Sequence, residues 1–129
     1  MLFRSSCFII DIDCPQDALG METGAISDGQ ISASSEWAAY LGASSGRLHW
    51  QAQPSKQGSW SAAINDANQW LQVDFVNQYT TVTGVATQGR NGGDQQWVKI
   101  YQLQYSNDGV NFQYYKEQGQ TANKVVWNK

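Results

Sequence analysis

Residues 70–75 read WLQVDF, and this stretch decides the fold class. Side chains of two sets alternate along it. The odd-numbered positions hold the apolar residues Leu71, Val73 and Phe75, and the even-numbered positions hold Trp70, Gln72 and Asp74. A period of two places successive side chains on opposite faces, which is the pattern of a half-buried β-strand. Long amphipathic helical periodicity is absent from the sequence, so we expect an all-β protein.

Further strand signals lie on both sides of this stretch. Upstream, residues 29–34 read GQISAS and have strand character. Downstream, residues 80–89 read TTVTGVATQG, a run rich in β-branched residues in which Gly84 suits a bulge. Residues 98–115, VKIYQLQYSNDGVNFQYY, predict a hairpin because Asn107, Asp108 and Gly109 tolerate positive φ. Residues 123–128, NKVVWN, predict one more strand.

The segment between the first two strands has weaker periodicity. Residues 36–45, EWAAYLGASS, suit a short helical turn limited by Gly42 and the serines. We expect a short strand over Leu48 to Gln51 and then a long loop, since Pro54 and Gly58 lie among Ser and Asn residues.

Composition narrows the class of protein. The chain has 129 residues, the size of one domain, with 15% charged and 12% aromatic residues including six tryptophans. Low charge with abundant Trp, Tyr, Gly, Ser and Gln suggests an all-β extracellular domain. The net charge of −3 argues against a broad electrostatic grip on nucleic acid and against membrane binding by a polybasic patch. Insertion of exposed aromatic side chains into a membrane remains open.

The N-terminal residues 1–13 are expected to form an extension or a degenerate signal segment. Their apolar run from Cys7 to Ile10 is interrupted by Asp11 and Asp13, well before the usual length of a signal core. No stretch of the sequence is long enough to cross a membrane. The two cysteines, Cys7 and Cys14, do not make a disulfide framework or a metal site.

Catalytic chemistry has little support. The single histidine, His49, lies between Leu48 and Trp50, where a structural role is the common one. The acidic residues are scattered, so their spacing suggests no acid–base pair. Residues 11–17, DIDCPQD, lack the glycine and the terminal glutamate of a calcium loop. We therefore expect no catalytic residue, no metal site and no cofactor.

Two loops are better candidates for binding. Residues 34–47 carry Trp37 and Tyr40 among small residues, and these aromatics are either tucked into the core or displayed for contact. Residues 86–97, ATQGRNGGDQQW, place short polar side chains around a charged pair, which suits hydrogen bonding to sugar hydroxyls or to a peptide. An ordinary solvated turn fits the second loop as well.

From Cys14 to Trp127 the chain resembles the discoidin domain, also called the F5/8 type C domain. The resemblance is carried by several long motifs in the family's order: CPQDALGMETGAISDGQISASS at 14–35, RLHW at 47–50, WLQVDF at 70–75, VTGVATQGR at 82–90 and WVKIYQLQYSNDGVNFQYY at 97–115. One departure is Phe75-Val76, where the family usually has Leu-Gly.

The resemblance implies an eight-stranded jelly-roll β-sandwich of the galactose-binding-like type over residues 14–129. It also implies a secreted or cell-surface setting and a non-enzymatic role. Ligands of such domains include galactose-type glycans, anionic phospholipid surfaces, collagen and peptide ends. Binding in the family uses loops at one end of the sandwich.

The resemblance also implies which residues face a ligand. Three loops contribute, namely a first spike at Trp37, Ala38, Ala39 and Tyr40, a second loop at Arg90, Asn91, Asp94 and Gln95, and a third at Trp60, Ser61, Asn65 and Asp66.

The family pattern continues past Lys129, with further strands and a closing cysteine that pairs with the opening one, here Cys14. We therefore expect the domain to be incomplete at its C-terminus, with Cys14 a free thiol and the isolated chain marginal in stability.

Three functions remain open at this stage. The first is recognition of a cell-surface glycan or an extracellular protein through the polar second loop, with stacking by Trp37, Tyr40 or Trp60. The second is docking on an anionic phospholipid surface through the aromatic spike, which the acidic net charge weakens. The third is a structural spacer in a multidomain protein.

Overall fold

The structure, a computed structural model, describes residues 2–5, 18–76 and 80–128. The expectation of an all-β protein is confirmed, because this part of the chain contains strands and only short 3₁₀ helices. In chain order the elements are β1 Leu2–Ser5, η1 Asp28–Gln30, β2 Ile31–Ala33, η2 Ala39–Leu41, η3 Ala43–Ser45, β3 Leu71–Val73, β4 Val82–Ala86, β5 Ile100–Gln102, β6 Gln104–Tyr105, β7 Gln113–Tyr114 and β8 Val125–Trp127. They form two compact units, Met1–Gln95 and Gln96–Lys129.

The core of the first unit surrounds the β2–β3 ladder. The two strands are antiparallel, with Ile31 opposite Val73 and Ala33 opposite Leu71. The buried residues Met21, Ile26, Ile31 and Ala43 form the core cluster, and Leu71, Val73 and Phe75 are among the side chains that pack against it. Trp70 and Asp74 are exposed. The strand predicted at residues 70–75 is confirmed over Leu71–Val73, and its apolar side chains face the core.

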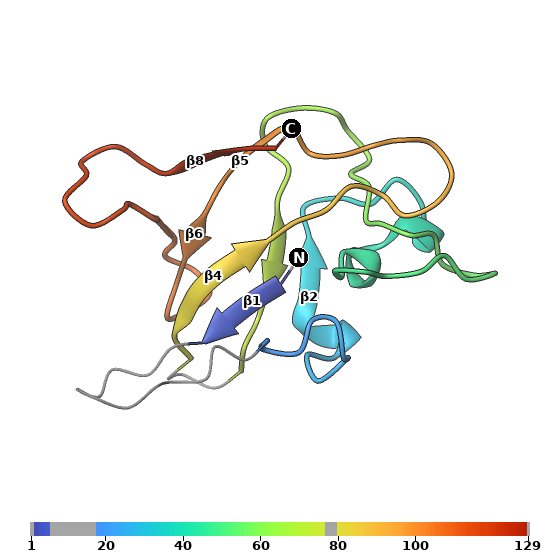
Figure 1. Ribbon diagram of the computed structural model, residues 1–129, viewed down its shortest axis with the longest axis horizontal. Coiled ribbons are helices and arrows are strands. Elements are labelled where there is room, and N and C mark those ends of the chain that lie inside the picture. Colours follow the sequence, from blue (N-terminus) through green and yellow to red (C-terminus); the bar gives the residue numbers. More distant parts are fainter. Residues whose placement is uncertain (1, 6–17, 77–79, 129) are drawn as a thin grey trace. The chain divides into compact units, whose positions relative to one another are not determined.

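The second ladder of this unit joins β1 to β4, and the two arrows lie side by side in Figure 1. The register shifts inside it, because Arg4 is opposite Gly84 whereas Ser5 is opposite Val82. One residue of β4 is thus passed over next to Gly84, as in a β-bulge. The bulge suggested by this glycine is confirmed.

A buried arginine fastens the start of the domain to the segment after β2. The guanidinium of Arg47 donates to the carbonyl oxygens of Met21 and Ile26, both at 2.8 Å, and to that of Ser44 at 3.1 Å. It also contacts the Asp28 carboxylate at 2.6 Å, while its own side chain is only 4% exposed. A buried charge is tolerated when it is paired and hydrogen-bonded, and Arg47 meets both conditions.

The strand expected over Leu48 to Gln51 is wrong. His49 has a φ of 55°, in the left-handed region, and this interrupts the extended backbone that a strand requires. Its N–H donates to the side-chain oxygen of Gln88 at 2.8 Å. The helical turn expected at residues 36–45 is confirmed, because η2 and η3 follow β2 there (Figure 1).

The second unit contains two antiparallel ladders, β5–β8 and β6–β7. The predicted hairpin is confirmed for β6 and β7. Its turn depends on Asp108, whose carboxylate accepts the main-chain N–H groups of Val110 and Asn111 at 2.9 and 2.7 Å. The residues of β5 pair with β8 rather than extending the hairpin, so the hairpin is shorter than residues 98–115.

The described residues form four two-stranded ladders and do not close into a sandwich. The predicted free thiol of Cys14 lies outside the described residues, as do most of residues 1–13, so both expectations stay predictions.

Candidate functional site

The first predicted loop displays its aromatic residues. Trp37 is 66% exposed and Tyr40 is 48% exposed, so display, and not burial, is the outcome for both. The loop is anchored from beneath, because Leu41 is buried and the Glu36 carboxylate accepts the Ala43 N–H at 2.6 Å. Tyr40 thus projects from η2, which begins at Ala39, and Trp37 projects from the bend just before it, next to Ala38.

The third predicted loop supports the first. The Trp37 N–H donates to the Ser61 carbonyl at 2.8 Å, and the Ser61 N–H donates to the Leu41 carbonyl at 3.1 Å. Trp60 is half-buried against the core, and its indole Nε1 donates to the Ser35 carbonyl at 2.9 Å. The Trp60 side chain is therefore engaged by the scaffold, and ligand contact by Trp60 stays a prediction.

The outer part of that loop is exposed at Asn65 and Asp66. The Asp66 carboxylate accepts the side-chain N–H of Gln69 and the main-chain N–H of Asn68, both at 2.8 Å. These hydrogen bonds, the one from Gln69 first, hold the pKa of Asp66 below its usual value. Asp66 is thus a fixed anionic group at the surface.

The second predicted loop is also fastened to its surroundings. Nη2 of Arg90 donates to Oε1 of Gln57 at 3.1 Å, and the Asn91 N–H donates to the Gly58 carbonyl at 3.2 Å. Gly92 and Gly93 have φ values of 77° and 71°, which glycine adopts without strain. Beyond this turn the side chains of Asp94 and Gln95 are exposed.

Three residues in these loops or between them were not predicted from the sequence. Gln57 and Gly58 connect the first and second loops, and nothing in their local sequence signals this. Ile64, in the third loop, is 59% exposed. A signal for Ile64 did exist, because it is a large aliphatic residue within the polar stretch SAAINDANQ at residues 61–69.

Other places in the described structure offer little chemistry. His49 Nδ1 lies 2.8 Å from Glu22 Oε1 in an exposed pair. Among the described residues no group of three or more His, Cys, Asp or Glu is arranged to hold a metal ion. The same part of the chain has no helix with the length and apolar character needed to span a membrane.

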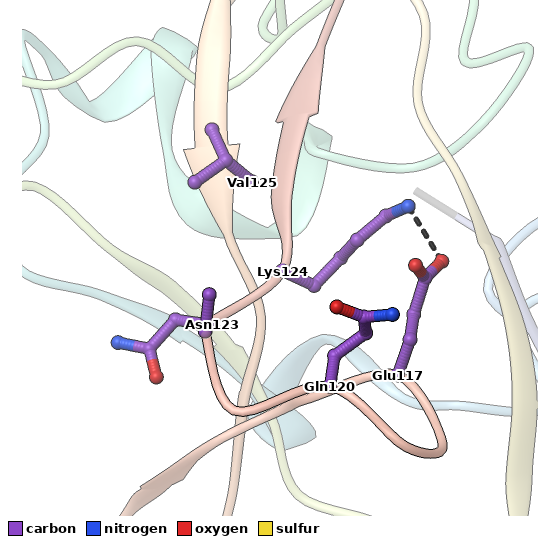
Figure 2. A pocket seen from close by; sticks show the side chains of 6 residues that line it. Glu117, Gln120, Asn123, Lys124 and Val125 are labelled. Atoms are coloured by element: carbon purple, nitrogen blue, oxygen red, sulfur yellow. Dashed lines mark hydrogen bonds and ion pairs between the residues drawn. The ribbon is translucent and has the colours of Figure 1, made fainter.

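The second unit has a shallow cavity of about 160 Å³ next to β8. Figure 2 shows Lys124 and Glu117 facing each other there, with Nζ and Oε1 2.6 Å apart. The two charged groups at this cavity thus neutralise each other, and we assign it no function.

The fold and the loops define an all-β domain that displays large apolar side chains on loops held by hydrogen bonds. A family model, the F5/8 type C domain, matches residues 30–128. The chain belongs to this family, and the all-β discoidin-type fold expected from the sequence is confirmed.

The curated relatives agree with this assignment. Lactadherin of Bos taurus is 37% identical over 113 residues, covering 83% of this chain and 26% of lactadherin. EGF-like repeat and discoidin I-like domain-containing protein 3 of Homo sapiens is 40% identical over 116 residues, covering 84% of this chain and 23% of that protein. Coagulation factor V of Mus musculus is 37% identical over 112 residues, covering 83% of this chain and 5% of coagulation factor V. The chain therefore spans about a quarter or less of each of these relatives.

Proposed function

We propose that this chain is a non-catalytic, extracellular binding module whose contact surface is formed by the loops around Trp37, Ile64 and Arg90. Family membership supports the module character. The single observation that carries the proposal is the exposure of Trp37 and Tyr40 on a loop that is itself hydrogen-bonded and anchored by the buried Leu41. Large apolar side chains that are held exposed to water have an unfavourable solvation free energy and do not stabilise the fold. Their exposure therefore favours a role in contacting a ligand.

An amphipathic surface, such as a phospholipid headgroup layer, is the ligand class that these side chains suit best. Trp and Tyr favour the interface between water and acyl chains, and an exposed aliphatic residue such as Ile64 adds apolar area. The polar candidates are partly engaged within the protein, because Arg90 contacts Gln57 and Asp66 accepts bonds from its own loop. The net charge of −3 makes apolar insertion, rather than charge attraction, the expected driving force.

A glycan or an extracellular protein is the second candidate class. It is supported by the exposed polar groups of Asn65, Asp94 and Gln95 beside aromatic side chains. Such groups form directional hydrogen bonds to hydroxyls, while an aromatic ring covers the apolar face of a sugar.

The test is cosedimentation with vesicles of phosphatidylcholine, with and without phosphatidylserine. We expect the wild-type chain to bind at least one composition, and W37A to weaken the affinity roughly 10- to 100-fold, the equivalent of burying one large apolar side chain. The matched control is W127A, which removes another exposed tryptophan, in β8 and outside the three loops.

Two results would redirect the assignment. Failure of the wild type on both vesicle types, together with saturable galactoside binding that W37A weakens, would replace the lipid by a glycan. If W37A and R90A leave every binding phenotype of a parent protein unchanged, the module is a structural spacer.

A further inference from the structure

One residue outside the predicted site touches two of the predicted loops. The Gln57 main-chain N–H donates to the Tyr40 carbonyl at 2.7 Å. The side-chain Oε1 of the same residue accepts a hydrogen bond from Arg90 Nη2 at 3.1 Å. Gln57 therefore bonds to the spike loop through its backbone and to the second loop through its side chain.

The segment that carries Gln57 is held in place on its N-terminal side. Nζ of Lys56 contacts Oδ2 of Asp28 at 2.7 Å and Oγ of Ser44 at 3.1 Å, and lies 5.7 Å from the centre of the Trp50 ring. The main chain of Lys56 also exchanges two hydrogen bonds with Gln53, at 2.7 and 3.2 Å. These contacts fix the backbone of Lys56, the residue before Gln57. The backbone from which the Gln57 side chain extends is therefore held in place.

The segment is equally constrained on the C-terminal side. Gly58 forms an antiparallel bridge with Asn91. A Cβ atom at position 58 would overlap the carbonyl oxygen of Asn91, so the two backbones approach as closely as only glycine allows. The second loop is thus joined to this segment by both backbone and side chain.

We propose that Gln57 is a positioning residue that couples the spike loop to the second loop, so that the two act as one binding surface. Its Oε1 holds the Arg90 guanidinium, while its N–H holds the turn that displays Tyr40. This inference rests on the proposed function for its role in binding, but the coupling itself is a property of the chain without ligand. Gln57 is half-buried, and in this proposal it acts through Arg90 and Tyr40.

The test compares Q57A and Q57E by amide hydrogen exchange of the intact chain, read on peptides covering residues 36–42 and 88–96. Q57A removes the acceptor of the Arg90 Nη2 hydrogen bond, and we expect exchange in residues 88–96 to rise about tenfold, as for the loss of one charge-assisted hydrogen bond. Q57E retains an acceptor at the same length and should restore wild-type exchange. Q51A, at an exposed glutamine of the same loop, is the matched control.

A second readout uses phosphatidylserine–phosphatidylcholine vesicles. In the wild type, vesicle binding should slow exchange in both peptides, and in Q57A only in residues 36–42. Unchanged exchange of residues 88–96 in Q57A would overturn the inference, as would a uniform rise across all peptides that Q57E does not restore. If the wild type binds no vesicles, the lipid assignment fails, but the ligand-free exchange still decides the role of Gln57.

Discussion

The two units of this chain are stabilised in different ways. Among the described residues, every buried one lies before residue 59, and none of residues 96–128 is buried. In the first unit, contacts join residues far apart in sequence, such as Arg47 with Met21 and β2 with β3. The second unit also pairs distant residues, in the β5–β8 ladder, but with no buried side chain among its described residues. Its β6 and β7 are joined by a turn of seven residues, 106–112, whose own side chains hold it together.

The difference shows which interactions offset the loss of conformational entropy on folding in each unit. A buried cluster offsets the conformational entropy of distant segments by removing apolar surface from water. A two-stranded ladder buries little and is marginal by itself, so the hydrogen bonds of its turn matter more. The candidate binding loops belong to the unit with the core, which explains how they keep a fixed geometry.

The largest expected effect is at Arg47. Replacement by alanine leaves the buried carbonyl groups of Met21 and Ile26 without their donor, and we expect a loss of about 3 kcal/mol in unfolding free energy. R47K should lose less, because an ammonium can replace part of the network. Urea denaturation measures both.

The control for this comparison is V110A, which truncates a side chain that is 78% exposed in the second unit. It should change the unfolding free energy by no more than about 0.5 kcal/mol. Equal losses for R47A and V110A would contradict the contrast between a core-stabilised and a turn-stabilised unit.

A more local effect is expected at Asp108. Its carboxylate accepts hydrogen bonds from Asn111, Val110 and Ser106, and these hold the pKa of Asp108 far below its usual range. D108A should speed amide exchange at Val110 and Asn111 and across the β6–β7 ladder, without changing exchange in the first unit. D108N, which keeps one acceptor oxygen, should have a smaller effect. Global unfolding in D108A would show that the turn supports more than its own hairpin.

The smallest effect is a pH dependence from Asp28. Hydrogen bonds from Lys56 and then Arg47 lower the pKa of this carboxyl below its ordinary value of 3.8. A lowered folded-state pKa means that the contribution is present above about pH 4 and is lost as the pH falls through the folded value. Because the Asp28 side chain is 55% exposed, the contribution should stay below about 1 kcal/mol.

The measurement is the loss of unfolding free energy between pH 7 and pH 3, in the wild type and in D28N. D28N should show the smaller loss. An identical loss in both proteins would assign the acid sensitivity to other carboxylates.

The sequence predicted most of the strands because their signals are local. The alternation in residues 70–75, the β-branched run before Gly84 and the turn at residues 107–109 each depend on neighbouring residues, and all three were confirmed. The strand over Leu48 to Gln51 was wrong because its apolar residues gave no warning of the left-handed φ at His49. That conformation accompanies a bond to Gln88, which is distant in sequence.

The same distinction applies to the candidate site. The order and types of residues were enough to identify the F5/8 type C family and to name the three loops, because the family's motifs consist of residues that are consecutive in the sequence. Whether Trp37 points outward, whether Trp60 is used by the scaffold, and how Gln57 joins Tyr40 to Arg90 were decided by the tertiary structure. These features depend on contacts between segments separated by many residues, and such contacts exist only after the backbone has brought the segments together.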